Sequence, residues 1–246
     1  HLVANGGNVE SVKAILDLYP KLEHLKVLSQ QDTVGWTVLH YAVYSNNHES
    51  LKLVQFILGL YPKSEHLEVL NKQTRHGWTV LHCAAHSIHL ESAKVIKYIL
   101  GVYPESQRLQ AVSTQGRYGT VLHVAARSGN LESLKTVLSI YPESERLQAV
   151  RMKDHFGRTA LHHAADSKTD ECIRFILTLY PESELIHAVS KSDECGRTVL
   201  HCAARSANPE AIQTIVKIYP AESERLRVLN TTTLCGKTVL HFAAGS

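Results

Sequence analysis

The chain has 246 residues, of which 44% are hydrophobic and 20% are charged, and its formal net charge at pH 7 is +3. This composition is ordinary for a globular protein, and so small a net charge does not by itself indicate a nucleic-acid binder. No apolar run approaches the ~20 residues that a membrane-spanning helix needs, and no signal-peptide pattern opens the chain. We therefore predict no membrane insertion.

One hexapeptide, Gly-x-Thr-Val-Leu-His, returns along the chain at a nearly constant step. A fixed period of 39 to 42 residues predicts a stacked-repeat solenoid, in which each unit contacts mainly its neighbours. One copy is shifted, Tyr118-Gly119-Thr120, and Ala160 replaces valine in the next. The motif histidines, the partial first copy included, are His1, His40, His82, His123, His162, His201 and His241.

We expect one array over residues 1–246, with five complete units and two partial units at 1–34 and 236–246. Because the chain begins at a motif histidine and ends just after an alanine pair, we expect it to be a fragment of a longer protein. The complete units begin at Gly35, Gly77, Tyr118, Gly157 and Gly196.

The sequence pattern within each repeat predicts three helices in a fixed order. The glycine suits a turn with positive φ, and the threonine two residues later suits the N-cap of a first helix. A glutamate nine residues after the motif histidine suits the first turn of a second helix. That helix must end at a Tyr-Pro pair, because proline excludes the α conformation from the residue before it. The segment after each Tyr-Pro, such as 143–150, predicts a short third helix, so the fold class is an all-α helical repeat solenoid.

Five cysteines, an odd number, argue against a disulfide framework. Cysteines at matching positions of stacked repeats, such as Cys83 and Cys202, or Cys195 and Cys235, would lie roughly 10 Å apart. That separation exceeds the ~7 Å Cα limit for a bridge. We therefore predict free thiols and a reducing, cytoplasmic compartment.

The string Gly-x-Thr-x-Leu-His-x-Ala-Ala, followed by a helix that starts at a glutamate, resembles the ankyrin repeat. The resemblance covers essentially the whole chain. It implies an ankyrin-like solenoid that acts as a scaffold for protein–protein interaction. It also implies that the motif histidine ties adjacent turns together through hydrogen bonds.

The repeats depart from the family pattern in three ways. Valine or alanine stands where proline usually follows the threonine, which affects stability only modestly. The period is about 40 residues rather than about 33, and the excess lies in the segment after Tyr-Pro. Ile88 and Lys168 stand where glycine is usual, so we expect rebuilt loops there. Repeats of this length resemble those of effector proteins that intracellular bacteria deliver into host cells, which implies a host protein as partner and the host cytosol as location.

Residues of the types used in catalysis or metal binding recur at the period of the repeat. Catalysis needs one constellation rather than seven copies, and no glycine-rich phosphate loop is present. Cys83, His86 and His89 are the best zinc candidates, but no second pair of ligands has matching spacing. We therefore predict no enzyme activity, cofactor, metal or small-molecule substrate.

The positions that vary between repeats predict the binding surface. In ankyrin-like proteins the turns beside the glycine and the end of the first helix face a concave groove. Trp, Tyr and Arg are enriched at binding hot spots, and both tryptophans of the chain directly follow a motif glycine. The predicted groove residues are Trp36, Tyr44, Arg75, His76, Trp78, His86, Arg127, Phe156, Arg158, Arg197, Arg205 and Lys237.

This groove would pass from aromatic to basic along the chain, so we predict a protein partner with an apolar segment next to an acidic one. Alternatively, the tryptophans only pack on the adjacent turn, or the array is the targeting arm or spacer of a larger enzyme whose catalytic domain lies elsewhere. Nucleic-acid binding through the arginines would show a steep salt dependence. The near-neutral net charge and the interspersed acids favour a protein over a nucleic acid.

Overall fold

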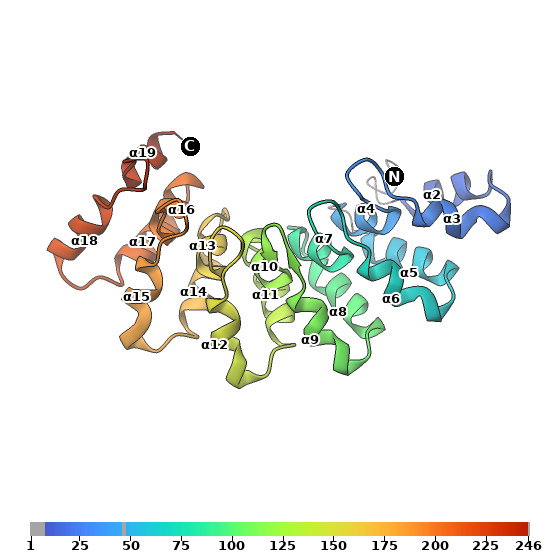
Figure 1. Cartoon of the computed structure of the whole chain (residues 1–246), viewed down its shortest axis with the longest axis horizontal. Helices are drawn as coiled ribbons and strands as arrows, with labels where there is room; N and C mark the ends of the chain where they lie inside the picture. The colour runs from blue at the N-terminus through green and yellow to red at the C-terminus, as the bar shows by residue number, and fades with distance from the viewer. Residues whose placement is uncertain (1–7, 46–47, 246) are drawn as a thin grey trace. The chain divides into compact units, whose positions relative to one another are not determined.

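The computed structural model describes residues 8–45 and 48–245, so the motif histidine His1 lies outside the described residues. Packing divides the chain into two compact units, unit 1 (His1–Val121) and unit 2 (Leu122–Ser246), and each is described by itself. The single array over 1–246 stays a prediction. The all-α fold is confirmed, since the repeats are built almost entirely of helices (Figure 1).

The first helix of a repeat begins directly after the motif threonine. Thr159 is the N-cap of its helix, and the Nδ1 atom of His162 accepts the backbone N–H of Thr159 at 3.2 Å and lies 3.0 Å from its Oγ1. The histidine thus takes the role that Glu or Gln has in a capping box. First helices are α4 (Val38–Tyr44), α7 (Val80–His86), α10 (Val121–Ser128), α13 (Ala160–Ala165), α16 (Val199–Arg205) and α19 (Val239–Ala244).

The alanine pairs of the first helices form the centre of the core. Small side chains let neighbouring first helices pack closely. No surface is exposed at Ala84, Ala85, Ala164 and Ala165. Within unit 1, α4 packs on α7; within unit 2, α13 packs on α16 and α16 on α19.

The second helix of a repeat begins at or beside the periodic glutamate and ends within three residues of the Tyr-Pro tyrosine, as predicted. Second helices are α2 (Val9–Leu16), α5 (Ser50–Leu60), α8 (Ser92–Val102), α11 (Leu131–Leu138), α14 (Glu171–Leu177) and α17 (Pro209–Val216).

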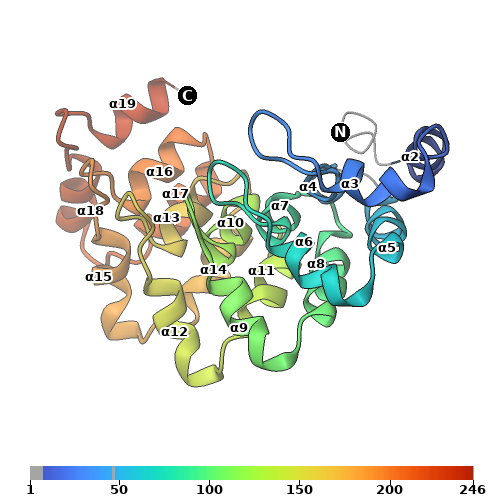
Figure 2. The ribbon, with the colours of Figure 1, turned by 45° about the vertical axis from the view of Figure 1, so that its right-hand side comes forward.

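The predicted third helix is present after every Tyr-Pro pair. Figure 2 shows α6 and α9 side by side in unit 1, and α12 and α15 in unit 2. Three of these helices open with a 3₁₀ turn: η1 (Lys21–Glu23), η2 (Lys63–Glu65) and η3 (Glu182–Glu184). The third helices are α3 (His24–Ser29), α6 (His66–Asn71), α9 (Glu105–Ser113), α12 (Glu143–Arg151), α15 (Leu185–Ser190) and α18 (Glu222–Leu229).

The Tyr-Pro tyrosines join consecutive repeats. The Tyr103 hydroxyl donates to Oδ1 of Asn71 at 2.8 Å, at the end of the preceding third helix. Tyr219 and Ser190 share an equivalent hydrogen bond of 2.8 Å in unit 2. Both rings are also buried, so these two tyrosines contribute to packing as well as to hydrogen bonding.

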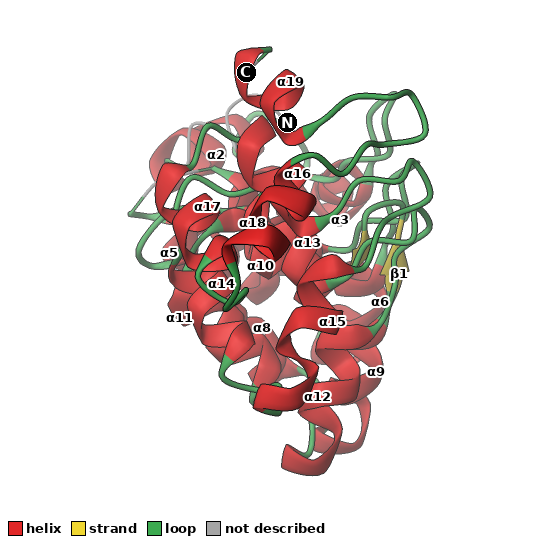
Figure 3. Ribbon diagram, turned by 90° about the vertical axis from the view of Figure 1, so that its left-hand side faces the viewer, coloured by secondary structure: helices red, strands yellow, loops and turns green. Residues whose placement is uncertain are grey.

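After each third helix the chain runs through an extended loop, here called a finger, to the motif glycine. Figure 3 shows one of these fingers with the short strand β1 (Gln115–Gly116) in it. Gly35 has φ +84°, and a Cβ on it would lie 2.8 Å from the backbone nitrogen of Arg75 on the next finger, so only glycine fits. One finger forms a hairpin of β1 (Gln115–Gly116) and β2 (Gly119–Thr120), which pairs Gln115 with Thr120 and Gly116 with Gly119.

Backbone hydrogen bonds connect successive fingers within each unit. The N–H of Arg75 donates to the carbonyl of Val34 at 3.0 Å in unit 1. In unit 2 the N–H of Glu194 donates to the carbonyl of Phe156 at 2.9 Å, and that of Leu234 to the carbonyl of Cys195 at 3.0 Å. These bonds fix the side chains at the finger tips relative to one another. In each unit, the surface formed by its fingers and the ends of its first helices is called the finger face of that unit below.

Candidate functional site

An acidic residue three positions before the motif glycine holds several fingers in shape. One oxygen of Asp154, Oδ1, accepts the backbone N–H groups of Phe156 at 2.8 Å and Arg158 at 2.9 Å. The corresponding oxygen of Asp193 accepts those of Cys195 and Arg197, each at 2.9 Å. The finger-tip side chains therefore stand on a rigid backbone turn.

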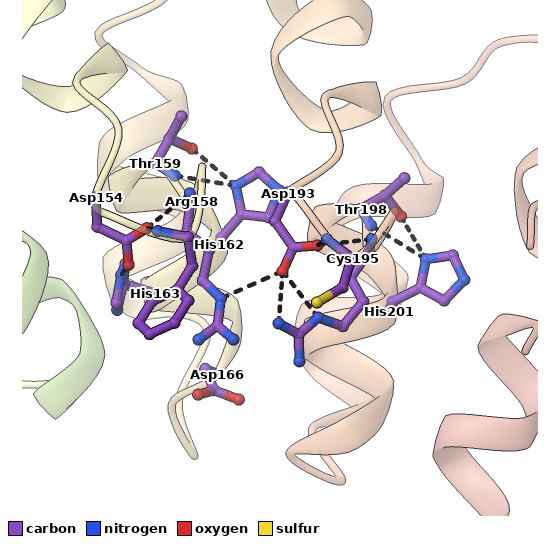
Figure 4. Close-up of polar contacts among 12 residues, drawn as sticks. Asp154, Arg158, Thr159, His162, His163, Asp166, Asp193, Cys195, Thr198 and His201 are labelled. Atoms are coloured by element: carbon purple, nitrogen blue, oxygen red, sulfur yellow. Dashed lines mark hydrogen bonds and ion pairs between the residues drawn. The ribbon is translucent and has the colours of Figure 1, made fainter. Parts of the chain in front are cut away.

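The second carboxylate oxygen of Asp154 accepts a hydrogen bond from Nε2 of the buried His163 at 2.8 Å (Figure 4). Burial alone would raise the pKa of Asp154, but the bonds from His163 and from backbone N–H groups outweigh it and lower the pKa to about 2. Burial lowers the pKa of His163 despite the carboxylate beside it, so a neutral imidazole donates to an ionised acid. This pair supports the finger and does not face a partner.

Unit 1 carries a continuous row of aromatic side chains on its finger face. Trp36 lies 5.0 Å from Tyr44 between ring centroids, Tyr44 stacks on His86 at 5.5 Å, and His86 lies 5.3 Å from Trp78. Tyr118 extends the row beyond Trp78 at 6.3 Å. We call these five residues the aromatic row. Four of the sequence-predicted groove residues, from two repeats, therefore belong to this row.

The aromatic row is neither a buried core nor a freely exposed surface. Trp36, Tyr44, Trp78 and His86 are all half-buried. A Cβ on Gly116 would lie 2.8 Å from Cδ1 of Trp78, so the absence of a side chain there makes room for the indole. The tryptophan thus does pack on the adjacent finger, and the residue as a whole remains half-buried.

The fingers that carry the aromatic row of unit 1 also carry basic side chains. Arg75 and His76 are exposed, and the guanidinium of Arg117 lies 5.9 Å from the Tyr118 ring centroid. Asp32 is used within its own finger, where it accepts the N–H groups of Val34 and Trp36 and the Tyr41 hydroxyl. An acidic partner group would therefore find positive charge beside apolar rings in unit 1.

Unit 2 carries a cluster of arginines that are paired with aspartates of the same chain. Nη2 of Arg205 lies 2.6 Å from Oδ1 of Asp166, and Nη2 of Arg127 lies 3.4 Å from Oδ2 of the same residue. Asp193 has a fully buried side chain, and its Oδ2 contacts Nε of Arg158 at 3.3 Å and Arg197 at 2.8 Å (Figure 4). These four arginines and two aspartates form what we call the arginine–aspartate cluster.

The remaining predicted groove residues lie apart from these clusters or at their margin. The guanidinium of Arg158 lies 5.5 Å from the Phe156 ring centroid, and Phe156 is half-buried. Lys237 is exposed on the finger of the last repeat. The set therefore divides into an aromatic group in unit 1 and an arginine group in unit 2.

The sequence did not identify the residues of this chain that contact and position these side chains. Tyr118 and Arg117 lie at the shifted motif copy, where the register of the repeat is irregular. Asp166 stands at the position that Arg127 and Arg205 hold in the flanking repeats, so the alternation of charge at the repeat period was a usable signal. The pairing of Asp193 with an arginine of the preceding repeat had no such signal.

Motif histidines in both units connect repeats as the resemblance implied. Nε2 of His162 lies 3.1 Å from the carbonyl oxygen of Lys191, and Nε2 of His201 lies 3.1 Å from that of Thr231. In unit 1, Nε2 of His40 lies 3.3 Å from the Trp78 carbonyl oxygen. In each of these histidines Nδ1 contacts the N-cap threonine and Nε2 contacts the next repeat. Both ring nitrogens are therefore used in structural contacts.

Two loops that lack the usual glycine differ from each other. Lys168 donates from Nζ to the carbonyl of Ser206 at 2.8 Å, which links two loops of unit 2. Ile88 is 66% exposed.

The zinc candidates of the sequence do not form a cluster. Cys83 is buried and His86 belongs to the aromatic row. No group of three His, Cys, Asp or Glu residues within 8–45 and 48–245 is arranged to hold a metal ion.

The comparisons with known proteins agree with this architecture. Ankyrin repeats in three copies match residues 91–185 and 122–225, and a single ankyrin repeat matches residues 34–62. No curated protein matches the chain. In the part of the chain that the structure describes, no helix has the length and apolar character to cross a bilayer. The matched segments cover more than half of the chain, and the chain belongs to the ankyrin-repeat family.

Proposed function

We propose that this chain binds a partner protein on its finger face, with the aromatic row of unit 1 as the apolar anchor. Ankyrin repeats are generic protein–protein interaction modules, which supports the general part of this proposal. The observation that carries its location is the half-exposed row of Trp36, Tyr44, His86 and Trp78. A soluble protein rarely gathers such rings on one face without a use for them.

The rings are held in place before any partner arrives. Each ring of the aromatic row contacts the next at 5.0 to 6.3 Å, so few rotamers are lost on association. Ordering a side chain at an interface costs about 0.5–1.5 kcal/mol, and a preformed surface avoids most of that cost. Apolar side chains of the partner would be buried against the exposed parts of Trp36, Tyr44 and Trp78.

Arginines supply the second part of the recognition. Arg75 at a finger tip of unit 1 and Arg127 and Arg205 in unit 2 are exposed or partly exposed. Charges of this kind mainly raise the association rate and fix the register of the partner. A partner with an apolar segment next to an acidic one fits both features, and the long repeat favours a host protein in the cytosol. The chain would act as a scaffold without chemistry of its own, within a single array over 1–246.

Affinity capture with quantitative mass spectrometry tests this proposal. The baits are the chain itself, a Trp36→Ala, Trp78→Ala double variant, and a Tyr98→Ala control. Tyr98 is a half-buried aromatic residue on the second helix α8, away from the finger face. We expect a partner that the chain and the control retain and the double variant loses by tenfold or more, since each truncated hot spot costs about 2 kcal/mol. Circular dichroism should show equal helicity for all three.

Equal retention by the double variant would exclude the aromatic row and place the site on the helices or on the third-helix segments. The captured partner, once purified, should show the same order of affinities by calorimetry. A partner that binds the double variant as tightly as the unchanged chain would contradict the proposal.

A further inference from the structure

The third helices of unit 2 form two junctions, one between α12 and α15 and one between α15 and α18. At the first junction Arg151, the last residue of α12, contacts the carboxylate of Glu184. Its guanidinium also lies 5.4 Å from the ring centroid of Tyr180, the tyrosine that precedes α15. The side chain of Arg151 is 27% exposed. A guanidinium near the surface thus contacts both a carboxylate and an aromatic ring.

The second junction has the same kind of acid and ring but a small side chain in place of the arginine. Ser190 is the last residue of α15, as Arg151 is of α12. Its hydroxyl lies 2.8 Å from that of Tyr219. Glu224 and Glu184 have the same place in their repeats when counted back from the motif glycine. The second junction therefore keeps the carboxylate and the tyrosine and lacks the guanidinium.

A cleft of about 220 Å³ lies at this second junction. Ser190, Tyr219 and Val228 are among the residues that line it. Burial is the main reason that the pKa of Tyr219 is raised, and the negative charge of Glu224 adds to it, so the carboxylate lies near a ring of the cleft. We attribute the cleft to the short side chain of Ser190, because a guanidinium occupies the matching place at the first junction.

One carboxylate oxygen of Glu224 is buried without a donor. Among the residues that the structure describes, none donates a hydrogen bond to its Oε2 atom. An unsatisfied buried group is costly, and more so when it is charged. The arginine next to it in the sequence is used elsewhere, since Arg225 donates to the carbonyls of Tyr219 at 2.7 Å and Pro220 at 3.2 Å. A ligand with N–H donors would satisfy this oxygen.

We propose that the cleft binds the guanidinium group of an arginine side chain of a partner protein, between Glu224 and Tyr219. The occupant is inferred from Arg151, whose own guanidinium has the matching place at the first junction. A guanidinium is planar and has five N–H donors, so it can satisfy a carboxylate and lie over an aromatic ring at once. The inference goes beyond the proposed function, because this contact lies on the third helices and not on the finger face.

One positive charge of the chain opposes this binding. Arg227 lines the cleft and is exposed. Salt screens an exposed charge, whereas a buried pair is screened much less. The attraction therefore depends on the buried oxygen of Glu224 and not on a net negative charge around the cleft. It follows that Arg227→Gln should bind an arginine side chain more tightly than the unchanged chain does.

Nuclear magnetic resonance titration with N-acetyl-arginine amide tests the proposal. We expect saturable shifts of the backbone signals of Ser190 and Val228, with a dissociation constant on the order of millimolar. N-acetyl-citrulline amide has the same shape without the charge, and N-acetyl-lysine amide has the charge without the planar group. Both should bind about fivefold or more weakly, because the proposed contact needs charge and planar geometry together.

Variants of the junction locate the site. Glu224→Gln should weaken the binding of N-acetyl-arginine amide about tenfold, because it removes the charge that strengthens the hydrogen bonds. Glu222→Gln is the matched control, since it makes the same change of charge at an exposed residue of the same helix. It should bind like the unchanged chain. Ser190→Arg should abolish the binding, because its own guanidinium would fill the cleft, and Arg151→Ser should create a second site at the first junction. Circular dichroism checks that all variants fold.

Two sources of a guanidinium group are distinguished by a glycine-flanked arginine peptide and free arginine. We expect the peptide to bind at least as tightly as N-acetyl-arginine amide. A cleft that admits free arginine but not the peptide would serve a small molecule, and that result would overturn the assignment to a partner protein.

Two further results would overturn the proposal. One is that N-acetyl-citrulline amide binds as tightly as N-acetyl-arginine amide, or that neither produces saturable shifts. The other is that properly folded Glu224→Gln binds like the unchanged chain. The Trp36→Ala, Trp78→Ala double variant should bind N-acetyl-arginine amide normally, so failure of this proposal and failure of the proposed function are distinguishable.

Discussion

At the scale of single residues, the turn acid and the residue after the motif histidine depend on each other. Where the turn residue is an aspartate, its second oxygen needs a donor, which Tyr41 supplies to Asp32 and His163 to Asp154. Where the turn residue is a threonine, as at Thr74, its single oxygen is satisfied by a backbone N–H. The residue after the motif histidine is then apolar, and the pairs are Thr74 with Cys83 and Thr233 with Phe242.

Asp193 is followed by the apolar Cys202 at that position and yet has its second oxygen satisfied. Arg197 of its own finger and Arg158 of the preceding one supply the donors. The requirement of the buried oxygen is thus met in each case, although the side chain that meets it differs.

This dependence predicts the effect of His163→Leu on stability. The substitution leaves a buried oxygen of Asp154 without its donor, so the free energy of unfolding should fall by about 1–3 kcal/mol. The double variant Asp154→Thr, His163→Cys copies the pair Thr74 and Cys83 of another repeat, and should be the more stable of the two. Urea unfolding followed by circular dichroism measures both. A double variant less stable than His163→Leu would contradict the dependence.

At the scale of elements, the third helix and the tyrosine before it explain the long repeat. The helix ends at Tyr-Pro, which leaves the tyrosine carbonyl without a helical partner. An arginine side chain supplies the missing donor. Arg146 donates from Nε to the carbonyl of Tyr141 at 3.3 Å, and Arg225 donates to that of Tyr219 at 2.7 Å. The extra residues therefore form a third helical row whose members are bonded both within and between repeats.

The hydroxyl of Tyr219 gives a test of the bonds between repeats. Tyr219→Phe keeps the buried ring and removes only the hydrogen bond to Ser190, so it should cost about 1 kcal/mol. Tyr19→Phe is the matched control, because Tyr19 has the same place in the first repeat but is 41% exposed, and should change stability far less. Urea midpoints of the two variants give the comparison. Equal shifts would show that the hydroxyl does not join the repeats.

At the scale of the whole molecule, the motif histidines make stability depend on pH. Burial lowers the pKa of His40, His82, His123 and His162 to about 4. In the unfolded chain a histidine binds a proton below about pH 6.5. Between these values the unfolded state binds more protons than the folded state, so acid favours unfolding.

We therefore expect the free energy of unfolding to change little between about pH 7 and 8 and to fall as the pH drops from about 6.5 to about 4. The slope has an upper bound of about 1.4 kcal/mol per pH unit for each such histidine. Asp154, with its pKa lowered to about 2, adds a loss only below about pH 4, so the two windows are separate. Urea midpoints at pH 7.5, 6.0 and 5.0 measure the first window. An unchanged midpoint from pH 7.5 to 5.0 would show that the histidines do not titrate this way.

Much of the fold was predictable because each local signal is repeated. Threonine N-caps, the Tyr-Pro helix ends and the third helix all follow from backbone chemistry within a few residues. The predicted groove positions were found by the same period, and the structure places four of them in the aromatic row. What the period does not contain is the direction of each side chain once the repeats are stacked.

The sequence by itself determined the period, the order of the helices, their ends and the family. Only the tertiary structure decided that Asp166 joins Arg127 to Arg205, that Asp193 holds Arg158, and that Gly116 makes room for Trp78. The physical reason is distance along the chain. Helix ends depend on interactions within one turn, whereas these contacts join residues 35 to 39 positions apart and depend on how one repeat packs on the next.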